Sequence, residues 1–199
     1  MKPTLAAALA GVAACLLVAP AEGQAPERLS ADPAITAMVR DASQRIGGAA
    51  AALGYDKHVV FLRAIAIESA APRGLGTMSR IGVARLDAAL VRSAGLTRDD
   101  VAWVVAHEFA HFILDHGARR ALVAQAHDGG TPERSAANRA FELEADRLGL
   151  RLARAAGYAF DPQGFFSRLR GGRLAGDTSN HPADALRIEA MQAAARGPG

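Results

Sequence analysis

Cysteine is almost missing from the 199-residue sequence, and aromatic residues make up only 5% of it. The single cysteine, Cys15, lies within an N-terminal apolar segment. If that segment is removed as a leader, the mature chain has no disulfide and no thiol nucleophile. The few aromatic residues and the abundant alanine favour closely packed helices over a β-sandwich.

A strong charge bias is also missing, because 23 lysine and arginine residues stand against 20 aspartate and glutamate residues, for a formal net charge of +3. No long basic run is present, and basic residues do not alternate with aromatic ones, so we expect no nucleic-acid partner. Half of the residues are hydrophobic and 22% are charged, which supplies enough apolar material for a core and excludes wholesale disorder.

The first residues have the pattern of an export signal. Lys2 supplies a positive charge, residues 5–18 form an apolar run, and the sequence A-P-A at 19–21 offers a small-residue cleavage site. We therefore predict a signal peptide of residues 1–21, followed by a single domain of residues 22–199. The apolar run is short for a membrane span, which needs about 20 residues.

A lipoprotein leader is a second interpretation of the same segment. Residues 12–15, Val-Ala-Ala-Cys, resemble a bacterial lipobox, in which Cys15 becomes the lipidated first residue of the mature protein. Either leader predicts a protein exported to the periplasm or the cell envelope. Membrane association is expected only through an uncleaved leader or through a lipid on Cys15.

Helix signals dominate the rest of the chain after a flexible start predicted at residues 22–32. Two helices begin with clear caps, at Asp32 before Pro33 and at Thr97, three residues before Asp100. The expected helices span about residues 33–53, 86–93, 97–116, 131–156, 162–169 and 182–196, and the expected strands span 57–67 and 79–84. The sequence therefore predicts an α+β fold with a helix-dominated core and a small β-sheet.

The most informative segment is His107-Glu108-Phe-Ala-His111, an H-E-x-x-H motif inside the expected helix 97–116. His107 and His111 are one turn apart, so both imidazoles point to one side and can share a metal ion. Zn²⁺ accepts imidazole nitrogen readily. Glu108 is rotated by about 100° from His107, where it can hold a water molecule without binding the metal itself.

Ordinary polar residues on a helix are the alternative explanation of these three side chains. The helix is apolar nearly all round, however, so it should be buried and offers no polar face. Burying two imidazoles and a carboxyl group without partners would cost several kcal/mol, and a metal with its water removes that cost. We therefore predict a zinc site.

A catalytic zinc site usually has three protein ligands and a water. On the next long helix, Glu142 and Asp146 share one face because they are four residues apart. Gly149 and Ala153 continue this face, so it can approach the metal-binding helix closely. We interpret Glu142 as the third ligand and Asp146 as a hydrogen-bond acceptor for a ligand histidine. Glu144 points elsewhere and is interpreted as solvated; a simple acidic surface is the alternative for the whole group.

The order and spacing of these motifs resemble a known family. The H-E-x-x-H motif at 107–111, followed by E-L-E-A-D at 142–146, is similar to the gluzincin peptidases that include the CAAX prenyl proteases, the HtpX-like membrane proteases and the BepA-like periplasmic proteases. The resemblance covers about residues 79–191 and implies a zincin-like fold. It also implies that Glu142 is the third zinc ligand and that Asp146 supports a histidine.

A third element of the resemblance is Ser-Asn-His-Pro at 179–182, similar to the family's S-T-H-P segment, with Asn180 in place of the common threonine. The resemblance places His181 near the metal, where it either donates to the oxyanion or binds zinc in an inhibited resting state; a structural role in a loop is the alternative. Arg187 either bonds a carboxylate of the site or faces solvent. The remaining histidines lack partners at a useful spacing and are interpreted as structural or exposed: His58, His116 and His127.

These residues together predict zinc-dependent hydrolysis of peptide bonds in protein or peptide substrates. Zinc would polarise the substrate carbonyl and activate a water, and Glu108 would take the water proton and pass it to the leaving amine. An edge strand near residues 79–84 would bind the extended peptide. By resemblance alone, exported family members of this size imply quality control of unfolded or misassembled proteins in the cell envelope.

Two other functions use the same residues differently. A non-catalytic zinc-binding chaperone or scaffold module would keep the fold, but it would not need a base such as Glu108 and would close its fourth metal position. A helical adaptor would carry these polar residues incidentally and would bind no metal. The metal content and the effect of removing Glu108 distinguish the three functions.

Overall fold

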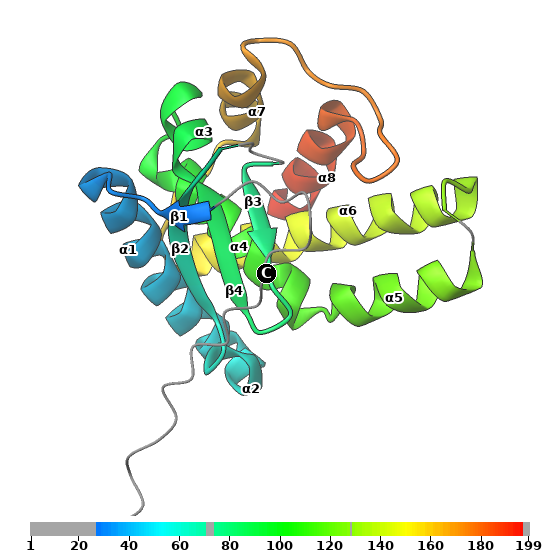
Figure 1. Cartoon of the computed structure of the whole chain (residues 1–199), viewed down its shortest axis with the longest axis horizontal. Coiled ribbons are helices and arrows are strands. Elements are labelled where there is room, and N and C mark those ends of the chain that lie inside the picture. The colour runs from blue at the N-terminus through cyan, green and yellow to red at the C-terminus, as the bar shows by residue number, and fades with distance from the viewer. Residues whose placement is uncertain (1–26, 71–73, 128, 197–199) are drawn as a thin grey trace, which may run out of the picture.

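Figure 1 shows the computed structural model of the chain, which describes residues 27–70, 74–127 and 129–196. This part of the chain is an α+β fold in which helices dominate and one small sheet is present, as the sequence predicts. None of the helices in these ranges is long and apolar enough to cross a membrane. The predicted signal peptide of residues 1–21, including Cys15, lies outside the described residues.

The sheet has four strands: β1 (Glu27–Leu29), β2 (Arg63–Ser69), β3 (Gly76–Met78) and β4 (Val83–Asp87). Their order is β1-β2-β4-β3, so β1 and β3 form the two edges of the described sheet. The central strands β2 and β4 are parallel, and each edge strand is antiparallel to its neighbour.

Helices pack on the sheet and against one another. Their bounds are α1 (Pro33–Ala50), which continues through the π-helical η1 (Ala51–Tyr55) into α2 (Asp56–Val59), then α3 (Ala88–Ser93), α4 (Arg98–Ile113), α5 (His116–Ala126), α6 (Pro132–Ala155), α7 (Pro162–Arg170) and α8 (Asp184–Arg196). Helices α1 and α4 contact both the sheet and each other. Helices α5 and α6 lie side by side and extend away from the sheet (Figure 1).

Two of the predicted helix starts are confirmed. Asp32 caps α1, because its Oδ1 accepts hydrogen bonds from the backbone nitrogens of Ala34 and Ile35 at 3.0 and 3.1 Å. Thr97 and Asp100 cap α4 reciprocally: Asp100 N donates to Thr97 Oγ1 at 3.2 Å, and Thr97 N donates to Asp100 Oδ2 at 2.8 Å. This capping box fixes where α4 begins and therefore the register of the H-E-x-x-H motif.

The strand predicted at residues 57–67 is wrong in its first half. The chain continues there as the short helix α2, and strand β2 begins only at Arg63, which pairs with Val83 of β4. The apolar run that suggested a strand is not buried, since Val60 is 80% exposed and Phe61 is 57% exposed. An apolar run alone therefore misplaced the start of β2, because the position of its partner strand decides where pairing begins.

The strand predicted at residues 79–84 is only partly correct, because residues 79–82 form a turn and strand β4 begins at Val83. Ser79 N donates to Val83 O at 2.9 Å and closes a hairpin that joins β3 to β4. Gly82 in this turn has a φ of 79°, and an added Cβ would lie 2.7 Å from the carbonyl oxygen of Phe61, so glycine is required there. The predicted flexible start at residues 22–32 is also wrong in part, because β1 pairs with β2.

The end predicted for the motif helix is wrong as well. Helix α4 ends at Ile113, and His116 is not in its last turn but at the start of α5. Between the two helices Asp115 has a φ of 53°, the only positive φ at a non-glycine residue in the described ranges. Aspartate tolerates this left-handed conformation better than most residues, so it redirects the chain. His116 becomes fully buried as a result.

Helices α4 and α6 approach each other closely at Gly149. A Cβ built there would lie 3.0 Å from both Cα and N of His107, which is tighter than an ordinary van der Waals contact. Ala145 and Ala153 on α6 are fully buried in the same core. The predicted face of small residues on α6 therefore brings this helix against the H-E-x-x-H segment.

Replacing Gly149 by alanine should lower the free energy of unfolding by about 1–3 kcal/mol, because the new methyl group overpacks the α4–α6 contact. Urea denaturation followed by circular dichroism measures the change. Gly117→Ala is the matched control, because an added Cβ at this position in α5 meets no atom within 4 Å. The control should be neutral or stabilising. Equal loss of stability in both variants would contradict the close packing.

Candidate metal centre

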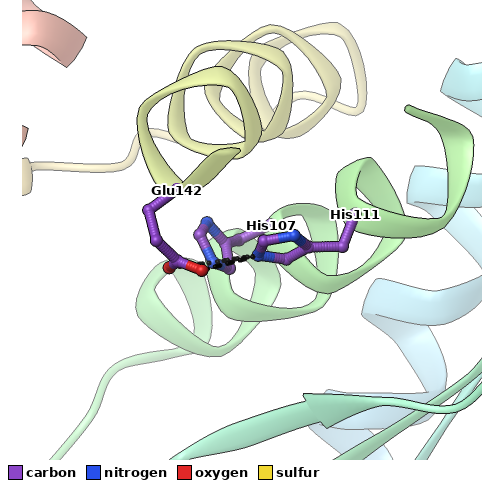
Figure 2. A group of neighbouring side chains, drawn as sticks. All are labelled: His107, His111 and Glu142. Atoms are coloured by element: carbon purple, nitrogen blue, oxygen red, sulfur yellow. Dashed lines mark hydrogen bonds and ion pairs between the residues drawn. The ribbon is translucent and has the colours of Figure 1, made fainter. Parts of the chain in front are cut away.

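The two histidines of the motif and Glu142 meet in one buried cluster (Figure 2). His107 and His111 come from α4, and Glu142 reaches them from α6. The Nε2 atoms of the histidines are 3.1 Å apart, Oε2 of Glu142 is 3.5 Å from Nε2 of His107, and Oε1 is 3.4 Å from Nε2 of His111. All three residues are at most 8% exposed.

These separations are short enough for the three residues to share one metal ion. Ligand atoms bound tetrahedrally at about 2.0–2.1 Å lie about 3.3 Å from one another. The histidine nitrogens, 3.1 Å apart, lie close to that value, and each nitrogen has a different oxygen of Glu142 at 3.5 or 3.4 Å. One candidate ligand atom from each residue lies within 4.8 Å of the other two. The cluster also lies inside a helix pair with an apolar core, where three such polar groups are costly without a shared partner. This buried group could therefore hold a metal ion.

Charge around the cluster controls its protonation. Burial alone would lower the pKa of His107, but contacts with Asp146 and Glu142 outweigh burial and raise it to about 9. Burial and the neighbouring charge of His107 lower the pKa of His111 well below 6.5. Burial opposes the charged form of Glu142, yet hydrogen bonds from His107 and His181 keep its pKa below the usual range. The histidine pair thus binds one proton that an incoming cation must displace.

Asp146 and Arg187 support His107 from behind. Oδ1 of Asp146 lies 3.0 Å from Nδ1 of His107, although the oxygen is out of line with the ring N–H. Arg187 on α8 donates to both oxygens of Asp146, at 2.8 and 2.6 Å, and its guanidinium lies over the rings of Trp103 and Phe166. Two roles were predicted for Arg187: a bond to a carboxylate of the site, or exposure to solvent. The structure shows the bond, and the Arg187 side chain is buried.

His111 is supported by a second set of contacts that the sequence did not indicate. Its Nδ1 lies 2.8 Å from Nδ1 of His116, whose Nε2 lies 3.2 Å from Oε2 of Glu144. Arg119 donates to both oxygens of Glu144 at 2.6 and 3.1 Å. The interpretation of Glu144 as a simply solvated residue is therefore wrong. His116 was interpreted as structural or exposed, and the structure shows it buried. It also contacts the candidate ligand His111 directly.

Glu108 lies beside the candidate ligands without belonging to their group. It is 8% exposed, and burial raises its pKa to about 7. The start of the edge strand β3 lies against it, because a Cβ added to Gly76 would be 2.8 Å from Oε1 of Glu108. The edge strand expected near residues 79–84 is therefore misplaced, and the edge that borders the centre is Gly76–Met78.

His181 and Arg120 contact the outer side of Glu142. Nδ1 of His181 lies 3.0 Å from Oε2 of Glu142, and Arg120 donates to Oε1 at 2.6 Å. The side chain of His181 is 54% exposed, so this residue lies at the entrance to the centre. Arg120 could not be found from the sequence, because it belongs to α5, a helix that the sequence did not predict.

Comparisons with known proteins add no family assignment. No protein-family model matches the chain, and no curated protein matches it.

Zinc affinity should rise about tenfold per pH unit from pH 7 and level off near pH 9, because each bound ion displaces one proton. The proton is the one that His107, with its pKa of about 9, carries below that pH. A zinc titration against a competing chelator from pH 6.5 to 9.5 measures the slope. A constant affinity across this range would mean that the histidine pair carries no proton to displace.

Replacing His116 by phenylalanine should weaken zinc binding about tenfold to a hundredfold, because His111 loses the contact that orients its ring. The new ring keeps the stacking on Phe141, whose centroid is 5.0 Å from that of His116. The matched control is His58→Phe, since His58 contacts Phe112 rather than a candidate ligand. Unchanged zinc affinity in His116→Phe would show that this contact does not position His111.

Proposed function

We propose that the protein is a zinc-dependent endopeptidase of the cell envelope that hydrolyses peptide bonds in unfolded or misassembled proteins. The observation that carries the proposal is the buried cluster of His107, His111 and Glu142, with Glu108 beside it on the same helix. Two imidazole nitrogens and a carboxylate oxygen suit Zn²⁺ better than the harder ions Mg²⁺ and Ca²⁺, which prefer oxygen ligands.

The residues around the cluster have separate tasks in this proposal. Zinc, when bound, supplies a Lewis acid that polarises the substrate carbonyl and lowers the pKa of a water. Glu108 takes a proton from the attacking water and passes it to the leaving amine, and its pKa of about 7 suits both steps at neutral pH. Asp146 and His116 each hold one ligand imidazole in place. His181, exposed beside Glu142, is the candidate donor to the oxyanion.

The edge strand β3 supports a peptide as the substrate. In the described sheet β3 pairs only with β4, so its other edge has free backbone groups. An extended peptide that pairs with this edge would place its backbone next to Glu108, because Gly76 of β3 lies against that side chain. Unfolded segments are extended and accessible, so they fit such an edge better than a folded chain does.

The cellular part of the proposal has other support. The predicted signal peptide of residues 1–21 favours the periplasm or the cell envelope, and a lipid on Cys15 is the alternative means of attachment. The resemblance of the two motifs to exported gluzincin peptidases favours protein quality control. Neither argument depends on the geometry of the metal centre.

Replacing Glu108 by glutamine should lower kcat for an unfolded casein substrate by about 10²- to 10⁴-fold while zinc stays bound, because the variant loses the general base but no ligand. Fluorogenic digestion and metal analysis of the purified protein measure both quantities. Glu189→Gln on α8, at an exposed position, is the matched control. A zinc-loaded wild type that digests no faster than Glu108→Gln would favour the non-catalytic zinc module, and protein without stoichiometric zinc would favour the adaptor.

A further inference from the structure

A polar pocket lies beside the candidate metal centre. Its volume is about 320 Å³, and its lining residues are Arg120, Arg134, Asn138, Glu142, Asn180 and His181. Glu142 and His181 belong to the centre, whereas Arg134, Asn138 and Asn180 have no part in it. The pocket therefore shares a wall with the metal centre and extends beyond it.

Three of the lining residues form a row on α6. Arg134, Asn138 and Glu142 are spaced by four residues, so they lie on the same face of the helix. With a rise of 1.5 Å per residue, Arg134 lies about 12 Å from Glu142 along the helix axis, which is roughly the length of four extended residues. A peptide held at the metal centre could therefore place one of its own groups against Arg134.

The opposite wall of the pocket is a loop tied to α6. Asn138 Nδ2 donates to Asn180 Oδ1 at 3.1 Å, and Arg139 donates to the carbonyl oxygen of Thr178 at 3.3 Å. Within the loop, His181 N donates to Thr178 Oγ1 at 2.9 Å. These contacts hold the loop in place without a ligand, so the loop loses little conformational freedom when a ligand binds.

The pocket carries positive charge. Arg120 and Arg134 are two cations, and Glu142 is the acid among the described lining residues. Arg120 is already bonded to Glu142. Arg134 makes no ion pair within the described residues and is half-buried, so its guanidinium can hold a planar anion through two hydrogen bonds. A divalent cation on Glu142 would make the pocket more positive still.

We propose that this pocket binds a carboxylate of the substrate and that Arg134 selects it. The inference rests on the proposed peptidase function, because a peptide offers carboxylates from two sources, acidic side chains and its C-terminus. A charge-assisted hydrogen bond of this kind discriminates a carboxylate from its neutral amide by about tenfold to a hundredfold. The protein would therefore prefer peptides with a carboxylate a few residues from the cleaved bond.

Two series of fluorogenic peptides test the proposal with the zinc-loaded full-length protein. One series exchanges glutamine for glutamate at each of the three positions on either side of the cleaved bond, and the other compares a free C-terminus with a C-terminal amide. One placement should raise kcat/KM at least about tenfold over its neutral partner in the wild type. The position that responds identifies the source of the carboxylate.

Arg134→Gln should bring this ratio close to one, because the contact that distinguishes a carboxylate from its neutral amide is lost. Arg147→Gln, an exposed arginine on the same helix and outside the pocket, should leave the ratio unchanged. Arg134→Lys should give an intermediate ratio, since it keeps the charge but not the planar fork. Circular dichroism confirms that each variant is folded.

A binding measurement keeps this proposal separate from the catalytic one. Fluorescence anisotropy of the same peptides on Glu108→Gln should show the same preference for the carboxylate, and Arg134→Gln in that background should abolish it. Hydrolysis or binding without any preference, or a preference that survives Arg134→Gln, would overturn the pocket assignment and leave the peptidase proposal standing. Absence of hydrolysis with an Arg134-dependent binding preference would overturn the peptidase and support the pocket.

Discussion

The contact between the backbones of α4 and α6 is the constraint on which the candidate centre depends. Gly149 has no side chain to hold the helices apart, so Glu142, about two turns away on the same face, reaches the imidazoles of α4. The two histidine nitrogens are 3.1 Å apart, and each has an oxygen of Glu142 within 3.5 Å, so the three side chains could share one metal ion. The close approach of the two helices therefore brings the three side chains together.

Polar contacts behind the candidate ligands connect the cluster to the rest of the fold. Arg187 on α8 reaches His107 through Asp146, and Glu144 on α6 reaches His111 through His116 of α5. These groups lie at the border of an apolar core, where a polar group without a partner is costly and a paired one is held firmly. These contacts join helices α4, α5, α6 and α8 around the cluster, and they hold the imidazoles of His107 and His111 in position.

The parts of the centre that depend on helical periodicity could be predicted from the sequence. A helix keeps the same residues on one face whatever it packs against. The spacing of His107 and His111 on α4, and of Glu142 and the small residues on α6, therefore predicted these faces correctly. The extent of the strands could not be predicted, because pairing across the sheet decides it. The role of Arg187 could not be decided from the sequence, because its partner Asp146 is 41 residues away on another helix.

Helix α5 was missed for a different reason. The motif helix was expected to continue to residue 116, whereas it ends at Ile113 and the chain turns at Asp115 through one left-handed residue. A conformation adopted at a single aspartate has no periodic signal in the sequence. The residues that follow, His116 and Arg120, were consequently not assigned to the centre.

That turn at Asp115 has a consequence for how the protein can change over evolution. Helix α5 supplies the support of one candidate ligand and a cationic wall of the neighbouring pocket. One inserted residue in the turn would rotate the whole of α5 by about 100° relative to α4. The candidate metal centre and the neighbouring pocket would both be disrupted in the same step, so both depend on the length of this short connection.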